Sequence, residues 1–207
     1  LLTQFKTLDL NYTSYFPMRG HDTLVFNVFQ SQAIIDKKAT TDEAELRAKI
    51  GLGCAGMPDS PAKTSCLAAD NQVVQERIDY NTYGEATFIG GVQRLRSFQN
   101  GRYHAGNSLS YGAEYRWNIT DERTLMDIYI MRGIRTGIQA AFFLEQGTVS
   151  DNPARLWTAP KKTTVGTGFR LIFSGVTVRA DLGFGDEGSE MQIFLDYPWS
   201  LFSVDKP

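Results

Sequence analysis

The sequence of 207 residues contains no long uninterrupted apolar run and no excess of basic residues. A helix needs about 20 mostly apolar residues to cross a bilayer, so a helical membrane protein is not expected. The lack of such a run does not exclude a membrane β-barrel, because the strands of a barrel are apolar on one face only. The 21 lysines and arginines stand against 23 aspartates and glutamates, for a formal charge of −2. Nothing in this balance suggests binding to nucleic acid.

Patterns of catalytic and metal-ligating residues are also scarce. His21 and His104 are the only histidines, and neither forms a Ser/His/Asp order or a cluster with cysteine. The stretch Gly183-Phe184-Gly185 is not a nucleotide-binding loop, because no helix is expected after it. The sequence therefore predicts a protein that is not an enzyme and that holds no cofactor or metal ion.

The two cysteines, Cys54 and Cys66, are 12 residues apart in a stretch rich in Gly, Pro and Ser. Two cysteines within one loop favour a local disulfide, and thus an oxidising compartment. The alternative is a pair of free thiols in a cytosolic loop. The first residues, Leu1 to Gln4, show no signal-peptide pattern, so we expect a mature protein or a fragment.

The chain does contain 25 aromatic residues and many segments in which apolar and polar residues alternate. Alternation with period two is typical of β-strands with one apolar and one polar face. Two weaker segments lie near 77–89 and 124–132. The seven well-marked segments are 7–16, 23–33, 108–118, 137–147, 163–173, 175–185 and 189–199.

The length of these segments favours a membrane barrel over a soluble β-sandwich. They run for about ten residues, as tilted membrane strands do, whereas soluble strands average about five or six. Aromatic residues gather at segment ends, as in the aromatic girdles of membrane barrels. In a barrel the charges on the polar faces would form a network inside the lumen; these are Glu114, Arg116, Glu145, Arg170, Arg179 and Asp181.

The connections between segments are unequal in length. The turns near 173–175 and 186–188 are short, whereas the stretches 36–76 and 90–107 are long, polar and rich in glycine. Short turns on one side and long loops on the other are typical of outer-membrane barrels. A helical turn is expected near 41–47, where Thr or Asp can cap it. We expect one barrel domain over residues 1–207, with two long loops of the extracellular type.

The second long loop carries the most specific motif. The stretch 88–98 reads Phe-Ile-Gly-Gly-Val-Gln-Arg-Leu-Arg-Ser-Phe, and it resembles a lumen loop of BamA/TamA-type assembly barrels, the bacterial surface-antigen superfamily. In that family an aromatic-x-Gly-Gly segment leads into Leu/Val-Arg-Gly-Phe/Tyr. Later segments resemble the family's last strands in the right order, so the resemblance covers about residues 83–199. The loop residues concerned are Gly90, Gly91, Leu95, Arg96, Ser97 and Phe98.

The resemblance implies that the loop folds back into the lumen and that Arg96 reaches a carboxylate on the wall, in this chain Glu145. The planar guanidinium suits such pairing. Two positions depart from the family: Ser97 stands where the family has Gly, and Glu145 where it has Asp. Without the family motif, Arg96 would be interpreted as a solvated loop residue.

The resemblance also implies a location and a function. It predicts a protein of the bacterial outer membrane that inserts or exports client proteins without covalent catalysis. The expected partners are outer-membrane lipid, client β-barrel or secreted proteins, and accessory periplasmic proteins. The alternatives are a passive porin-like or structural outer-membrane barrel and, third, a soluble β-sandwich.

The expected number of strands, about eight, conflicts with the sixteen strands of the family barrels. An open sheet edge in lipid would cost several kcal/mol for each unpaired backbone group. Three arrangements avoid such an edge: half of a larger chain, a closed eight-stranded barrel, and a homodimer that completes one wall. We favour a fragment of a larger barrel.

Overall fold

The computed structural model describes residues 3–120, 125–128, 131–173 and 176–195. These residues form one antiparallel sheet with strand order β1-β2-β3-β5-β6-β7-β8, and β4 pairs with β5 beside this path. The elements are β1 (Gln4–Pro17), β2 (Thr23–Lys37), α1 (Glu43–Ile50), α2 (Pro61–Tyr83), β3 (Asn107–Asn118), β4 (Leu125–Ile128), β5 (Met131–Ser150), β6 (Lys162–Phe173), β7 (Val176–Gly185) and β8 (Gly188–Leu195).

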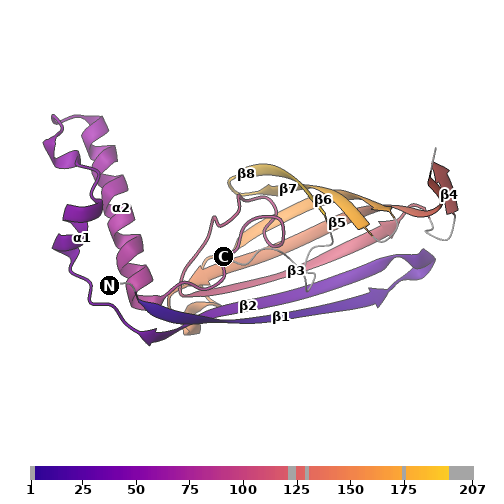
Figure 1. The fold of residues 1–207 in the computed structure, drawn as a ribbon, viewed down its shortest axis with the longest axis horizontal. Helices are drawn as coiled ribbons and strands as arrows, with labels where there is room; N and C mark the ends of the chain where they lie inside the picture. Colours follow the sequence, from indigo (N-terminus) through magenta and orange to yellow (C-terminus); the bar gives the residue numbers. More distant parts are fainter. Residues whose placement is uncertain (1–2, 121–124, 129–130, 174–175, 196–207) are drawn as a thin grey trace.

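The antiparallel β prediction is confirmed, and each of the seven well-marked segments coincides with a strand, residues 175 and 196–199 lying outside the described residues. The weaker segment near 124–132 corresponds to β4 and the start of β5. The sheet curves into an open trough, with the helices at one end and β4 at the other (Figure 1). In the described residues β1 and β8 do not pair with each other, so both are edges of the sheet.

The two faces of the sheet have opposite character. Along β5, Phe142 and Leu144 are 51% and 48% exposed, whereas Phe143 and Glu145 between and beside them are 5% and 3% exposed. The outer face carries a broad set of exposed apolar side chains: Leu8, Leu10, Tyr12, Phe26, Val28, Val165, Phe169, Leu171, Val178, Leu182, Phe184, Met191, Ile193 and Leu195. The inner face carries buried polar and charged ones: Asn27, Ser31, Ser108, Ser110, Glu114, Gln139, Thr164, Arg170, Thr177, Arg179 and Asp181.

The stretch 36–76 differs from the expected polar loop, because it contains α1 and most of α2. The prediction of a strand near 77–89 is wrong, since residues 77–83 form the last turns of α2. Helix signals are present at both ends: the Ser60 side chain caps the first turn, Pro61 is the first helical residue, and Gly84 follows the last with φ +71°. The strand was predicted there because apolar and polar residues alternate over a few positions.

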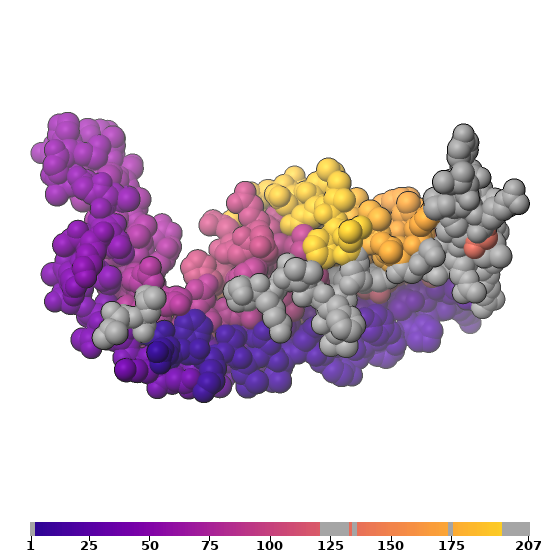
Figure 2. Space-filling view, in the orientation of Figure 1, coloured from indigo at the N-terminus to yellow at the C-terminus, as the bar shows by residue number. Residues whose placement is uncertain are grey.

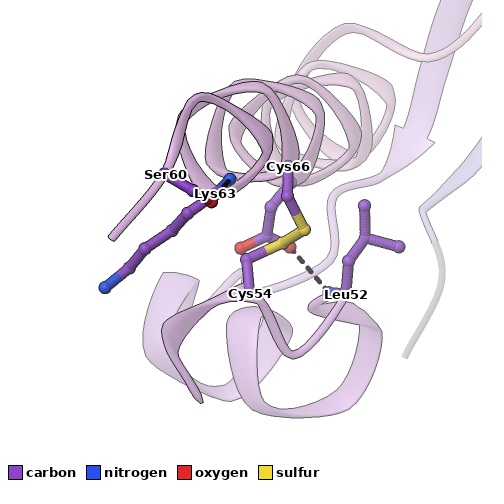
Figure 3. Close-up of a disulfide and its surroundings, with 6 residues drawn as sticks. Leu52, Cys54, Ser60, Lys63 and Cys66 are labelled. Carbon is purple, nitrogen blue, oxygen red and sulfur yellow. Dashed lines mark hydrogen bonds between the residues drawn. A yellow bond between two sulfur atoms is a disulfide. The ribbon is translucent and has the colours of Figure 1, made fainter. Parts of the chain in front are cut away.

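Helix α1 fulfils the expectation of a helical turn near 41–47. It begins after Asp42, whose carboxylate accepts hydrogen bonds from the backbone amides of Ala44 and Glu45. The predicted disulfide is present and joins Cys54, before α2, to Cys66 in its second turn (Figure 3). The Cα atoms are 5.8 Å apart, within the usual range. In the part of the chain that the structure describes, no helix is long and apolar enough to cross a membrane.

Candidate functional site: a loop packed on the inner face

The chain between α2 and β3, residues 84–106, forms a loop that lies in the trough; it is called the inner loop below. In the space-filling view pink atoms of this part of the chain lie above the indigo strands and beside the yellow β8 (Figure 2). The loop closes as an irregular hairpin. The amide of Ala86 donates to the carbonyl of Ala105, and Ile89 and Tyr103 exchange two backbone hydrogen bonds of 2.9 and 3.0 Å.

The turn of the inner loop depends on residues with positive φ. Gly90 and Gly91 have φ of +107° and +120°, values that only glycine adopts readily. Added Cβ atoms there would lie 2.7 Å from the carbonyl oxygen of Gln99 and 2.4 Å from the Asn100 side chain. Leu95 also has positive φ, at +52°, whereas Ser97 does not. Ser97, which stands where the resembled loop motif has Gly, therefore causes no backbone strain at this position.

An apolar cluster anchors the loop to the sheet. Ile89, Leu95 and Phe98 are almost fully buried, and Tyr103 and Val149 pack against them. The rings of Phe98 and Tyr103 meet edge to face with centroids 5.2 Å apart. Burial of three large apolar side chains stabilises the docked loop by about 5–9 kcal/mol before entropy losses are counted.

Arg96, at the centre of the loop, has no exposed surface and meets three carboxylates of the wall. Its Nε lies 2.9 Å from Oε1 of Glu145, and its backbone amide donates to the other oxygen of the same carboxylate at 2.9 Å. Its Nη1 lies 2.9 Å from Glu114 and 2.8 Å from Asp181. The guanidinium carbon also lies 3.4 Å from the ring centroid of Phe143. Side chains from three strands, β3, β5 and β7, thus contact one loop residue.

The other predicted network residues surround this centre. Arg170 and Arg116 pair with Glu114 at 2.9 and 2.7 Å. Arg179 pairs with Asp181 at 3.2 Å and also donates to the backbone carbonyl of Val92 in the loop. Four arginines and three carboxylates therefore share one buried volume, with a formal charge of 4 − 3 = +1. Buried charges of this kind are tolerated when each has ionic and hydrogen-bonding partners.

Glycines on the inner face provide the space for the loop backbone. A Cβ on Gly183 would lie 2.7 Å from the amide nitrogen of Ser97 and 2.8 Å from the carbonyl carbon of Arg96. A Cβ on Gly185 would lie 2.3 Å from the Ser97 hydroxyl oxygen, and one on Gly147 2.8 Å from the Ile89 side chain. Glycines at these positions permit close approach of the loop, which side chains would prevent.

Polar contacts tie the loop to the first strands as well. The Thr87 hydroxyl donates to the Asp9 carboxylate on β1, and the Thr87 amide donates to Ser31 on β2 at 2.9 Å. The hydroxyl of Ser108 on β3 donates to the Thr87 carbonyl at 2.6 Å. Together with the arginine contacts, these bonds link the loop to both halves of the sheet.

A solvent-exposed contact fixes the far side of the loop. Arg102 pairs with Glu187, in the turn between β7 and β8, at 2.7 Å, and the Tyr103 hydroxyl donates to the same carboxylate at 2.7 Å. These two hydrogen bonds, from Arg102 first, hold the pKa of Glu187 below its ordinary value. We call this group the loop latch.

The predicted site residues thus meet around the inner loop. The structure brings Arg96 and Glu145 together, and it adds Glu114 and Asp181 as direct partners of the same guanidinium. Asp9, Thr87 and Glu187 were not singled out by the sequence, since isolated polar residues on different segments carry no local signal. The aromatic residues at the end of the segment 189–199, Tyr197 and Trp199, were expected to contribute to the aromatic girdle, and they lie outside the described residues.

The fold and site define an antiparallel sheet with an apolar outer face, a charged inner face and a loop bound to the latter. Among the described residues, no group of His, Cys, Asp and Glu side chains is arranged to hold a metal ion. A scan against protein-family models finds no match, and a search of curated proteins finds none either.

Proposed function

We propose that this chain forms part of the wall of a transmembrane β-barrel in the bacterial outer membrane. The single observation that supports this proposal is the inverted polarity of the sheet, with large apolar side chains exposed and charged ones buried. In water, so broad an exposed apolar face would promote aggregation. In a bilayer it would face acyl chains, and the charged face would line the lumen.

Closure of this wall requires further strands, because β1 and β8 are open edges in the described sheet. Unpaired backbone groups in hydrocarbon are too costly to persist. The additional strands come either from a longer chain that includes this one or from a second copy. A homodimer would then complete one wall from two open sheets.

Within such a barrel, we propose a role in the insertion or export of other β-proteins. Two features support it: the ordered resemblance of residues 83–199 to the BamA/TamA-type barrels, and the loop bound by Arg96 inside the trough. The loop occupies lumen space that a wide diffusion pore would leave open. The sheet edges offer backbone groups on which a client strand could pair.

The membrane part of the proposal is tested by two leucines of nearly equal exposure. Leu182, on the outer face of β7, is 37% exposed, and Leu67, on α2, is 38% exposed. Leu182→Arg should lower the fraction of chain that folds into vesicles. The free energy of folding should become less favourable by about 2–4 kcal/mol if the site is deep in the bilayer. Leu67→Arg should leave it unchanged. Equal effects of the two substitutions, measured by heat-modifiable gel migration, would exclude a membrane orientation.

The assembly part is tested in liposomes that contain the folded chain. A urea-unfolded outer-membrane barrel is diluted into them, and its folding rate is compared with that in empty liposomes and in liposomes with the Leu67→Arg variant. Faster folding with both forms supports a role in assembly. Leakage of a trapped solute without any gain in client folding would instead identify a passive, porin-like barrel.

A further inference from the structure

The outer face of the sheet contains a groove that the inner loop does not use. It runs over β2, β3 and β5, has a volume of about 450 Å³ and is lined mostly by apolar groups. A second, shallower hollow of about 540 Å³ adjoins it, and the two share Ala113 and Leu144. Volumes of this size accommodate small organic ligands.

The groove exists because a small residue lies between two large ones. Ala113 on β3 is paired with Phe26 on β2 and with Leu144 on β5, and all three project from the outer face. The short Ala side chain leaves a depression between the Phe and Leu side chains. A long, thin apolar ligand fits such a depression better than a globular one does.

One end of the groove is polar and cationic. Trp157, 64% exposed, lines this end together with Tyr111 and Gln146, and the Tyr111 hydroxyl donates to the Gln146 side chain at 2.8 Å. The Lys161 ammonium nitrogen lies 5.9 Å from the centroid of the Tyr111 ring. Lys161 is exposed and, within the described residues, forms no ion pair. An apolar channel thus ends at a Trp, a Tyr and a positive charge.

We propose that this groove binds one acyl chain of an anionic phospholipid, with the lipid phosphate at Lys161. The proposal rests on the proposed membrane location of the sheet. The apolar groove provides contacts for the acyl chain. Trp157 and Tyr111 are amphipathic residues of the kind that favour the membrane interface, and they lie at the end of the groove where the headgroup would be. The ammonium group of Lys161 attracts the phosphate. Charge complementarity selects an anionic over a zwitterionic headgroup.

Tryptophan fluorescence tests this proposal, because the chain has only three tryptophans, at 117, 157 and 199. Trp117→Phe with Trp199→Phe leaves Trp157 as reporter of the groove, and Trp157→Phe with Trp199→Phe leaves Trp117 as reporter of the outer face elsewhere. Each variant is folded into phosphatidylcholine vesicles. Phosphatidylglycerol or phosphatidylcholine with brominated acyl chains is then added as quencher.

Half-quenching of Trp157 should need about a fivefold lower mole fraction of brominated phosphatidylglycerol than of brominated phosphatidylcholine, as one lysine near an anionic headgroup would produce. Trp117 should be quenched equally by both lipids. Ala113→Phe, which fills the groove, and Lys161→Gln should each abolish the preference at Trp157. The matched controls are Ala180→Leu on the outer face of β7 and Lys49→Gln on α1, and both should retain it.

Two failures are distinguishable. Equal quenching of Trp157 by both lipids, or a preference that survives Ala113→Phe, would overturn the lipid site while leaving the membrane barrel intact. If brominated lipid quenches neither Trp117 nor Trp157, the sheet does not face a bilayer, and the proposed function and the lipid site are both refuted.

Discussion

The connection between β2 and β3 contains two adjacent stretches that are stabilised by opposite means. The helical stretch, residues 38–83, is mostly exposed and is held by local interactions: the disulfide, the Asp42 and Ser60 caps and (i, i+4) ion pairs. The inner loop, residues 84–106, has no regular secondary structure beyond one isolated bridge, yet it is largely buried by contacts with distant strands.

This difference predicts which part of the molecule a substitution in each stretch should destabilise. Contacts between the helical stretch and the sheet lie at the ends of the stretch, where the Thr3 hydroxyl donates to the Asn81 carbonyl and the Phe5 ring meets Tyr80 edge to face. The stabilising interactions named above are local, so damage to them should stay local. The inner loop joins strands that are far apart in sequence, so damage to it should reduce the stability of the whole sheet. Four changes test this contrast, in order of decreasing effect.

Arg96→Ala should be the most damaging, because it leaves Glu145, Glu114 and Asp181 close together without their common cation. Loss of one partner from a buried ion pair typically costs about 3–5 kcal/mol. The free energy of unfolding in urea, measured on chain folded in micelles, checks this value. Glu145→Ala should add little in the Arg96→Ala background, whereas fully additive effects would argue that the two side chains do not interact.

Gly183→Ala should displace the inner loop from the sheet, because the new Cβ would lie 2.7 and 2.8 Å from backbone atoms of Ser97 and Arg96. Overpacking of this kind costs about 1–3 kcal/mol. The matched control is Gly56→Ala in the helical stretch, where a Cβ would meet no atom within 4 Å. Equal stability of the two variants in the same urea titration would contradict the close packing of the loop.

Replacement of both cysteines by Ser should destabilise the helical stretch alone. A disulfide that closes a short loop contributes about 2–3 kcal/mol, in this case against local opening of α1 and α2. Limited proteolysis should therefore cut within residues 38–83 faster than in the parent chain. The urea midpoint of the sheet should not move, and a shift as large as that of Gly183→Ala would show that the two stretches are coupled.

The loop latch should produce the smallest effect and a dependence on pH. The pKa of Glu187 is depressed in the folded chain, so its contribution is complete above the ordinary Glu pKa of about 4.3 and is lost as the pH falls through the lower folded value. The protection of residues 99–103 from hydrogen exchange, taken relative to the intrinsic exchange rate at each pH, should fall over that range. Glu187→Gln should remove this pH dependence, and an unchanged profile in the variant would exclude the latch as its cause.

Much of the sheet was predictable because its signal is local. Period-two alternation marked each of the seven long strands, and the short turns near 173–175 and 186–188 indicated that β6, β7 and β8 are antiparallel neighbours. Helix α2 was missed, although Ser60-Pro61 at its start and Gly84 at its end are ordinary helix signals. Its apolar residues do not form a stripe on one face, so the usual pattern of an amphipathic helix is absent.

The site was only partly predictable. The family resemblance pointed to Arg96 and Glu145, and alternation placed the other charged residues on one face. Nothing in the sequence revealed that Glu114 and Asp181 share the guanidinium of Arg96, or that Thr87 bonds to Asp9, 78 residues away. These contacts depend on register across strands and on the curvature of the sheet, neither of which is a local property.

The sequence by itself determined the seven long strands and which face of each is apolar, because both depend on neighbours along the chain. Only the tertiary structure decided where the inner loop lies and which charges meet beneath it. The physical reason is that a buried charge is stable only with several partners at close range, and those partners come from strands up to 85 residues away.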